Sequence, residues 1–180
     1  MSCIEKKRVK TAYTFFAREN LFEYYANEDS PIRIHRMIDA LVQSPEDVTK
    51  DAGFVHYDQL LLSEEVREWS SKDYIYPLLE YSRGESGEHT GGLLLLGARG
   101  TGKTALAKAI AVQAGVKFIP IDLRLYRNMR AIFTVARQQA PCVVFFDGLE
   151  KLLHATMQFN AQVDPEALRK QGIVIVATTN

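Results

Sequence analysis

The chain contains few cysteines, no excess of either charge and no long apolar segment. Its two cysteines, Cys3 and Cys142, lie far apart in the sequence, which argues against a disulfide or a metal site and fits a reducing intracellular setting. The 22 basic residues balance the 22 acidic ones, so the chain as a whole lacks the charge signature of a nucleic-acid-binding protein. Apolar runs are far shorter than the about 20 residues that span a bilayer, and the N-terminus lacks the apolar core of a secretory signal. We therefore expect a cytoplasmic or nuclear protein without a membrane span.

The first part of the chain, residues 1–53, is predicted to form a helical extension. Residues 11–26 are rich in aromatic side chains and are expected to form its first helix. Ser30-Pro31 and Ser44-Pro45-Glu46-Asp47 both carry helix-start signals, and the second has the acid of a capping box three residues after its serine. Asp51-Ala52-Gly53 predicts a turn, which we take as the boundary to the next domain.

The second part, residues 54–180, alternates between strand-like and helix-like segments. Apolar runs such as Val143–Phe146 are typical of strands that are covered on both faces. The sequence therefore predicts an α/β fold in which a parallel sheet is flanked by helices. Pro77 is expected to bend or end the first helix of this part. The predicted strands span residues 93–96, 116–121, 142–146 and 173–177, and the predicted helices span residues 63–81, 101–113 and 125–138.

A glycine-rich loop connects the first of these strands to the helix that follows it. Its sequence, Gly97-Ala98-Arg99-Gly100-Thr101-Gly102-Lys103-Thr104, matches the phosphate-binding loop of nucleoside triphosphatases. Unpaired backbone N–H groups and the helix dipole favour negative charge at a helix start. We expect Lys103 to reach the β- and γ-phosphates of ATP and Thr104 to hold Mg²⁺. The plainer alternative is a glycine-rich turn without a ligand.

Asp147 directly follows the apolar run Val143–Phe146. A carboxylate at the tip of a buried strand needs a partner, because burying a bare charge is costly. Magnesium requires hard oxygen ligands, and nucleoside triphosphatases supply one from an acid at the end of such a strand. We therefore predict that Asp147 and Thr104 are the magnesium ligands. The alternative is that Asp147 only caps the following turn.

From about residue 55 onward, the chain resembles the AAA family of ATPases. The segment Val55–Leu60 resembles the stretch that lies beside the adenine in this family, residues 64–78 resemble its first helix, and Val174–Asn180 resembles the strand that ends in an asparagine touching the γ-phosphate. The resemblance implies a P-loop ATPase domain that binds ATP and Mg²⁺, with Lys103 and Asn180 as catalytic residues. The nucleotide-binding residues that it implies are Gly97, Ala98, Arg99, Gly100, Thr101, Gly102, Lys103, Thr104, Ala105, Asp58 and Leu60.

Gly148 departs from the pattern of the family. In AAA ATPases a glutamate follows the magnesium aspartate and polarises the attacking water, whereas this chain reads Asp147-Gly148-Leu149-Glu150. A positioned base contributes about 10²- to 10⁴-fold to a rate, so its loss slows hydrolysis without removing ATP binding. Glu150 is a candidate replacement, although a residue two positions further on points in a different direction.

Other segments depart from the family as well. Leu61-Leu62 stands where the family has a glycine pair beside the adenine, which indicates a reshaped pocket or a shifted alignment. The interval after Asp122 lacks the aromatic-glycine loop that grips a polypeptide in the pore of the family's ring. Tyr126 is a remnant of that loop or, as we favour, a tyrosine on a helix face. The sequence therefore argues against threading of a protein substrate through a pore.

The sequence ends at Asn180, before the arginine finger, the helical lid and the last sheet strand of the family. We therefore expect residues 54–180 to form an incomplete AAA-type domain. Either the sequence is truncated, or the protein is a pared-down ATPase that depends on a partner. The likeness is nearest to the severing and disassembly branch of the family, such as spastin and katanin.

The basic and aromatic stretch Lys6–Phe16 loosely resembles the start of an HMG box, which binds DNA in the minor groove. The tryptophan of that module is missing there, because the sole tryptophan, Trp69, falls in the AAA-like helix. We favour an aromatic face that packs on the core or docks a partner, so nucleic acid is the less favoured partner.

We predict that the chain binds Mg-ATP through an AAA-type domain and hydrolyses it weakly. One alternative is an ATP-binding assembly or scaffold subunit that does not hydrolyse. The other is a DNA-associated ATPase that uses the basic N-terminus. In the family the nucleotide lies between subunits, so the resemblance implies other AAA subunits as partners in a homo- or hetero-oligomer.

Overall fold

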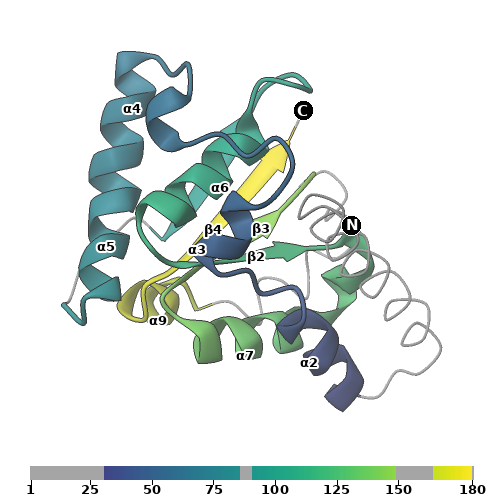
Figure 1. Ribbon diagram of the computed structural model, residues 1–180. Coiled ribbons are helices and arrows are strands. Elements are labelled where there is room, and N and C mark those ends of the chain that lie inside the picture. The colour runs from purple at the N-terminus through teal and green to yellow at the C-terminus, as the bar shows by residue number, and fades with distance from the viewer. Residues whose placement is uncertain (1–30, 86–90, 149–163, 180) are drawn as a thin grey trace, which may run out of the picture.

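The computed structural model describes residues 31–85, 91–148 and 164–179 (Figure 1). The expected helix over residues 11–26 and the Ser30 helix cap lie outside the described residues. Within the described ranges, no helix has the length and apolar character that crossing a membrane requires.

The centre of the fold is a parallel sheet of four strands (Figure 1). Its spatial order is β1-β4-β3-β2, and the expected parallel sheet is thereby confirmed. Leu96 is paired with Thr179 and Phe146 with Ala177, so the carboxyl ends of β1, β4 and β3 lie at one edge of the sheet. The strands are β1 (Gly92–Leu96), β2 (Lys117–Ile121), β3 (Cys142–Phe146) and β4 (Ile173–Thr179).

Strand β3 is buried at every position, because helices cover both faces of the sheet. Alternate side chains point to opposite faces of a strand: Val143 and Phe145 belong to one hydrophobic cluster, whereas Val144 and Phe146 belong to the other. Burial also raises the pKa of the Cys142 thiol to about 12, so this cysteine is a neutral core residue.

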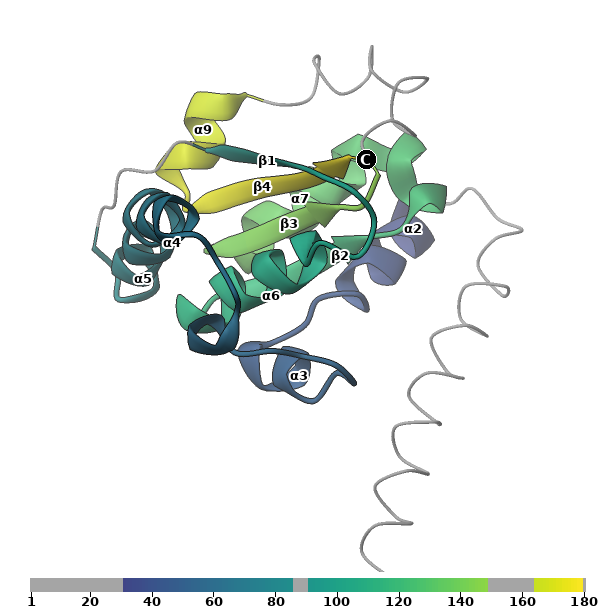
Figure 2. The ribbon, with the colours of Figure 1, turned by 90° about the horizontal axis from the view of Figure 1, so that it is seen from above.

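Helices on the two faces complete the layered arrangement (Figure 2). Helix α6 (Lys103–Gln113) contacts β2, β3 and β4 and contributes to the first cluster. Helix α7 (Met129–Gln139) contacts β2 and β3 on the other face, and α2 (Pro31–Asp39) packs against α7. The short helix α9 (Pro165–Lys170) precedes β4 and adds the buried Leu168 to the second cluster.

The predicted helix over residues 63–81, expected to bend or end near Pro77, continues past this residue to Ser82. It consists of α4 (Glu64–Ser70), a π-helical segment (Ser71–Ile75) and α5 (Tyr76–Ser82). The Tyr76 N–H donates to the Ser71 carbonyl, five residues back. Proline has no N–H for the α-helical ladder, and the wider turn directly before it accommodates that loss without ending the helix.

Two predicted helix starts differ from the structure. The helix expected from residue 101 begins at Lys103, because Gly102 has a φ of 88° and lies outside the helical region. The helix expected over residues 125–138 is divided into a 3₁₀ segment (Leu123–Asn128) and α7. Leu125 and Tyr126 are both buried against the core, and this tertiary packing outweighs the local preference for an α-helix.

Residues 31–53 pack directly against the sheet and α6. Gln43 forms an isolated antiparallel bridge with Phe118 of β2, with N–H···O distances of 2.8 and 2.9 Å. This bridge lies at the outer side of β2, an edge strand that also contains Pro120. Asp51 forms a half-buried ion pair of 2.7 Å with Lys108 of α6. The segment is therefore tied to the phosphate-loop helix as well as to the sheet.

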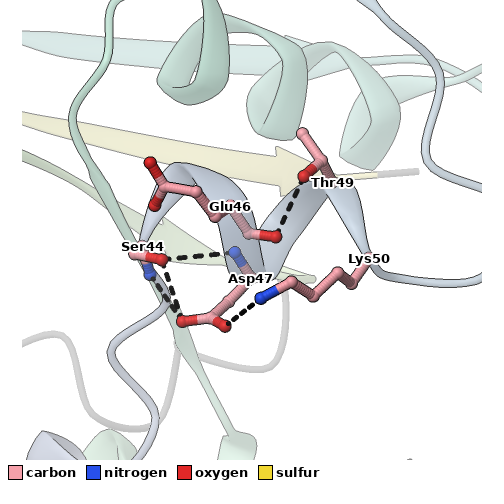
Figure 3. Close-up of polar contacts among 5 residues, drawn as sticks. All are labelled: Ser44, Glu46, Asp47, Thr49 and Lys50. Carbon is pink, nitrogen blue, oxygen red and sulfur yellow. Dashed lines mark hydrogen bonds and ion pairs between the residues drawn. The ribbon is translucent and has the colours of Figure 1, made fainter. Parts of the chain in front are cut away.

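The predicted capping box at the start of α3 (Pro45–Thr49) is confirmed (Figure 3). The Ser44 hydroxyl accepts a hydrogen bond from the Asp47 N–H at 3.2 Å, and the Asp47 carboxylate accepts bonds from the Ser44 N–H at 3.4 Å and the Ser44 hydroxyl at 2.9 Å. The Ser44 hydroxyl is the main cause that lowers the pKa of Asp47.

Replacing Ser44 with alanine is expected to raise the pKa of Asp47 towards its ordinary value and to cost about 1 kcal/mol of stability. Because folding lowers this pKa, the carboxylate stabilises the fold above its unfolded pKa of about 3.9, and this contribution is lost as the pH falls through the folded value. NMR titration of the carboxyl carbon measures the shift. Thr49→Ala is the control, because Thr49 bonds the Glu46 carbonyl instead. An unchanged Asp47 pKa in Ser44→Ala would contradict the assigned cause.

Candidate functional site

The loop between β1 and α6 depends on glycine for its backbone path. Gly97, Gly100 and Gly102 have φ angles of 153°, 86° and 88°, which L-residues with side chains rarely adopt. A Cβ atom on Gly100 or Gly102 would meet no atom within 4 Å. These two glycines are therefore required by the backbone conformation, and the space beside them is open to a ligand.

The start of α6 faces this loop with backbone N–H groups. The Leu106 N–H donates to the Gly102 carbonyl at 2.8 Å, which begins the helical ladder. The amides before it have no acceptor within the helix, and with the helix dipole they form a site that favours an anion. Phosphate binding by this loop stays a prediction, which the backbone angles of the glycines and the start of α6 support.

Lys103 extends its side chain back across the loop. Its ammonium donates to the carbonyl of Ala98 at 2.9 Å and also to the carbonyl of Gly97. The Thr101 hydroxyl donates to the same Ala98 carbonyl at 2.9 Å. The ammonium is therefore held against the backbone at the beginning of the loop. Of the other predicted nucleotide-binding residues, Arg99 and Thr104 are exposed and Ala105 is half-buried.

Asp147 lies at the end of β3 and is held by two hydroxyl groups. The Thr178 hydroxyl donates to Oδ1 of Asp147 at 2.7 Å, and the Tyr126 hydroxyl donates to the Asp147 carbonyl at 3.0 Å. The same Thr178 oxygen accepts a bond from the Gly148 N–H at 3.0 Å. Sequence reasoning missed Thr178 and this contact of Tyr126. The sequence held one signal for this contact: Thr178 places a hydroxyl group directly after the apolar residues of β4.

The sheet brings the two halves of the predicted site to one edge. The phosphate loop follows β1 and Asp147 follows β3, with β4 between them, so the two strands lie about 10 Å apart. A hydroxyl from Thr104 and a carboxylate from Asp147 are the hard oxygen donors that Mg²⁺ prefers. Among the described residues, no group of three or more His, Cys, Asp or Glu could hold a metal ion. This donor set fits magnesium, which takes few protein ligands and retains phosphate and water oxygens.

The segment expected beside the adenine lies against α6, as the 3₁₀ turn η1 (Tyr57–Gln59). The Leu60 carbonyl accepts a bond of 3.0 Å from Arg67, and Leu60 itself is half-buried. The Tyr57 hydroxyl lies 2.6 Å from the Ser70 hydroxyl. These contacts fix the turn to α4, and Asp58 is exposed on it.

Two of the predicted catalytic residues, Glu150 and Asn180, lie outside the described residues. Tyr126 is 3% exposed, and its ring centroid lies 5.6 Å from that of Phe146. It belongs to the 3₁₀ segment and not to the face of an α-helix. A tyrosine buried in this way cannot grip a polypeptide.

Gly148 has a φ of 81°, in the left-handed region. The sequence indicated only that a carboxylate is missing at this position. The structure adds that the backbone there adopts a conformation that a glutamate would occupy only with strain.

Residues 93–180 match the family model described as "ATPase family associated with various cellular activities (AAA)". The chain carries an AAA ATPase domain. A relative, the cell division cycle protein 48 homolog of Archaeoglobus fulgidus, is 32% identical over 184 residues. That alignment covers 91% of this chain but 24% of the relative, so the chain spans about a quarter of that protein's length.

Solved AAA structures share the fold of this domain. The AAA domain of FIGL-1 in complex with ADP has a TM-score of 0.65 at 19% identity, over 86% of this chain and 56% of that one. A katanin structure has a TM-score of 0.62 at 22% identity, over 82% of this chain and 52% of that one. At this level of identity the likeness concerns the fold, and it confirms the predicted AAA-type architecture.

Replacing Tyr126 with phenylalanine is expected to lower the free energy of unfolding by about 1 kcal/mol, because the ring stays in the core while a buried hydrogen bond is lost. Chemical denaturation monitored by circular dichroism measures the change. Tyr76→Phe is the matched control, since Tyr76 is 59% exposed, and it is expected to leave stability unchanged. Equal effects of the two substitutions would show that the Tyr126 hydroxyl does not support Asp147.

Proposed function

We propose that this AAA domain binds Mg-ATP at the Gly97–Thr104 loop and hydrolyses it slowly. The observation that carries the proposal is the loop itself. Three left-handed glycines and the start of α6 surround an ammonium group, at the same sheet edge as Asp147. The ADP in the FIGL-1 structure, which shares the fold, supports a nucleotide as the ligand.

Lys103 is the residue that would neutralise the phosphates. Its ammonium is bonded to the carbonyls of Gly97 and Ala98, and on binding one of its three N–H donors would point to a phosphate oxygen. The backbone amides of residues 98–105 would bind the remaining oxygens. Asp58 and Leu60 would lie beside the base, on the turn that contacts α6.

Thr104 and Asp147 would hold magnesium, directly or through water. The ion supplies charge neutralisation of the phosphates when it is bound. What the chain contributes is a hydroxyl at the first turn of α6 and a carboxylate fixed by Thr178. Both are oxygen donors on rigid elements, as magnesium binding requires.

The weak hydrolysis rests on Gly148, which provides no base next to Asp147. In this proposal, Asn180 touches the γ-phosphate. Glu150 is the replacement base. The same glycine favours a second candidate function, in which bound ATP promotes assembly without being hydrolysed. Partners would then be other AAA subunits, and the katanin structure, described for its self-assembly, supports this direction. A protein substrate and a DNA role for residues 1–26 stay predictions.

Replacing Lys103 with alanine is expected to abolish most ATP binding, because the loop loses its only ammonium. Titration with a fluorescent ATP analogue in MgCl₂ measures the affinity. Lys72→Ala is the control, since it removes an exposed lysine from the π-helical segment, and wild-type affinity is expected for it. Wild-type affinity in Lys103→Ala would overturn the assignment of the site.

Replacing Gly148 with glutamate is expected to raise phosphate release at least tenfold over Gly148→Ala, within the about 10²- to 10⁴-fold that a positioned base supplies. The alanine variant is the proper reference, because both substitutions strain a backbone with a φ of 81° and only one restores a carboxylate. Turnover per bound ATP is the quantity compared. Equal turnover in the two variants would show that a missing carboxylate does not limit the reaction.

A further inference from the structure

Thr178 links the Asp147 side chain to the main chain that follows it. Its hydroxyl donates to Oδ1 of Asp147 at 2.7 Å and accepts from the Gly148 N–H at 3.0 Å. Thr178 is 2% exposed, whereas Asp147 is exposed, so a buried hydroxyl holds a carboxylate that faces solvent. It lies on β4, the strand between the phosphate-loop strand and the Asp147 strand.

The two bonds leave the Thr178 hydroxyl little freedom. A threonine hydroxyl has one proton to donate, and here that proton is committed to the Asp147 carboxylate. Bonds from a hydroxyl to a charged carboxylate are short and stronger than bonds between neutral groups. The acceptor side of the same oxygen binds the Gly148 amide, so the carboxylate and the turn after it share one anchor.

We propose that Thr178 is a positioning residue for the magnesium-binding carboxylate. By holding Oδ1, it fixes the rotation of the Asp147 side chain, so that Oδ2 would hold Mg²⁺ or one of its waters. The inference rests on the proposed function, because it assigns Thr178 a role towards the same ion. Magnesium demands near-ideal octahedral geometry, so a carboxylate that rotates freely binds it less well.

The size of the effect follows from other metal sites. Removing a group that hydrogen-bonds a metal ligand costs about 10- to 100-fold in metal affinity. Valine has nearly the shape of threonine but no hydroxyl, whereas serine keeps the hydroxyl and loses a methyl group. Thr178→Val and Thr178→Ser therefore separate the hydrogen bond from the packing of β4.

The test is binding of a fluorescent ATP analogue to the full chain, measured in EDTA and during titration with MgCl₂. In Thr178→Val, the MgCl₂ concentration that gives half of the magnesium-dependent increase in binding is expected to rise about tenfold. The affinity for the ATP analogue in EDTA is expected to stay within about twofold of wild type. Thr178→Ser is expected to restore the wild-type titration. If Thr178→Val does not fold, Thr178→Ala, which only deletes atoms, replaces it.

An unchanged magnesium titration in Thr178→Val would overturn the inference. So would an equal loss of binding in EDTA and in magnesium, because that is the result of a purely structural role. The wild type separates this failure from failure of the proposed function. If wild-type protein shows no magnesium-dependent ATP binding, the proposed function itself is wrong. If it does show such binding and Thr178→Val matches it, only the role of Thr178 is wrong.

Discussion

The parallel register of β1, β4 and β3 is the constraint on which the rest of the structure depends. Parallel strands end at a common edge, and here that edge receives the glycine loop from β1 and Asp147 from β3. Helices on both faces bury the strands and keep this register in place. The loop and the carboxylate therefore lie at the same edge of the sheet because of the core packing.

Asp147 connects this edge to elements that lie far from the phosphate loop in the sequence. Tyr126 binds its main chain from the 3₁₀ segment after β2, and Thr178 binds its side chain from β4. Neighbouring AAA structures share the fold, and Gly148, directly after Asp147, has a φ of 81°. The fold is thus shared with these structures, and within it Asp147 is held by two hydroxyl groups from distant parts of the chain.

The sequence allowed the parallel sheet, the phosphate loop and the capping box at Ser44 to be predicted, because each rests on short-range patterns. The π-helical turn before Pro77 and the 3₁₀ segment around Tyr126 could not be foreseen, since long-range packing decides between helix types. The contacts of Thr178 and Tyr126 with Asp147 join residues about 20 to 30 positions apart and leave no mark in a local pattern. The sequence showed that Gly148 lacks a carboxylate, but only the structure showed its left-handed backbone conformation.

The bridge between Gln43 and Phe118 makes the two edges of the sheet unequal. On the β2 side, part of the backbone is already paired with Gln43, and Pro120 has no N–H to offer. Both features discourage strand addition and thereby protect the protein against edge-to-edge aggregation. On the other side, β1 exposes Leu94 and Leu96, and in the described part of the chain it pairs with β4 alone. Of the two edges, β1 is therefore the one less protected against the addition of a strand, although the Tyr74 hydroxyl bonds the Gly92 carbonyl there.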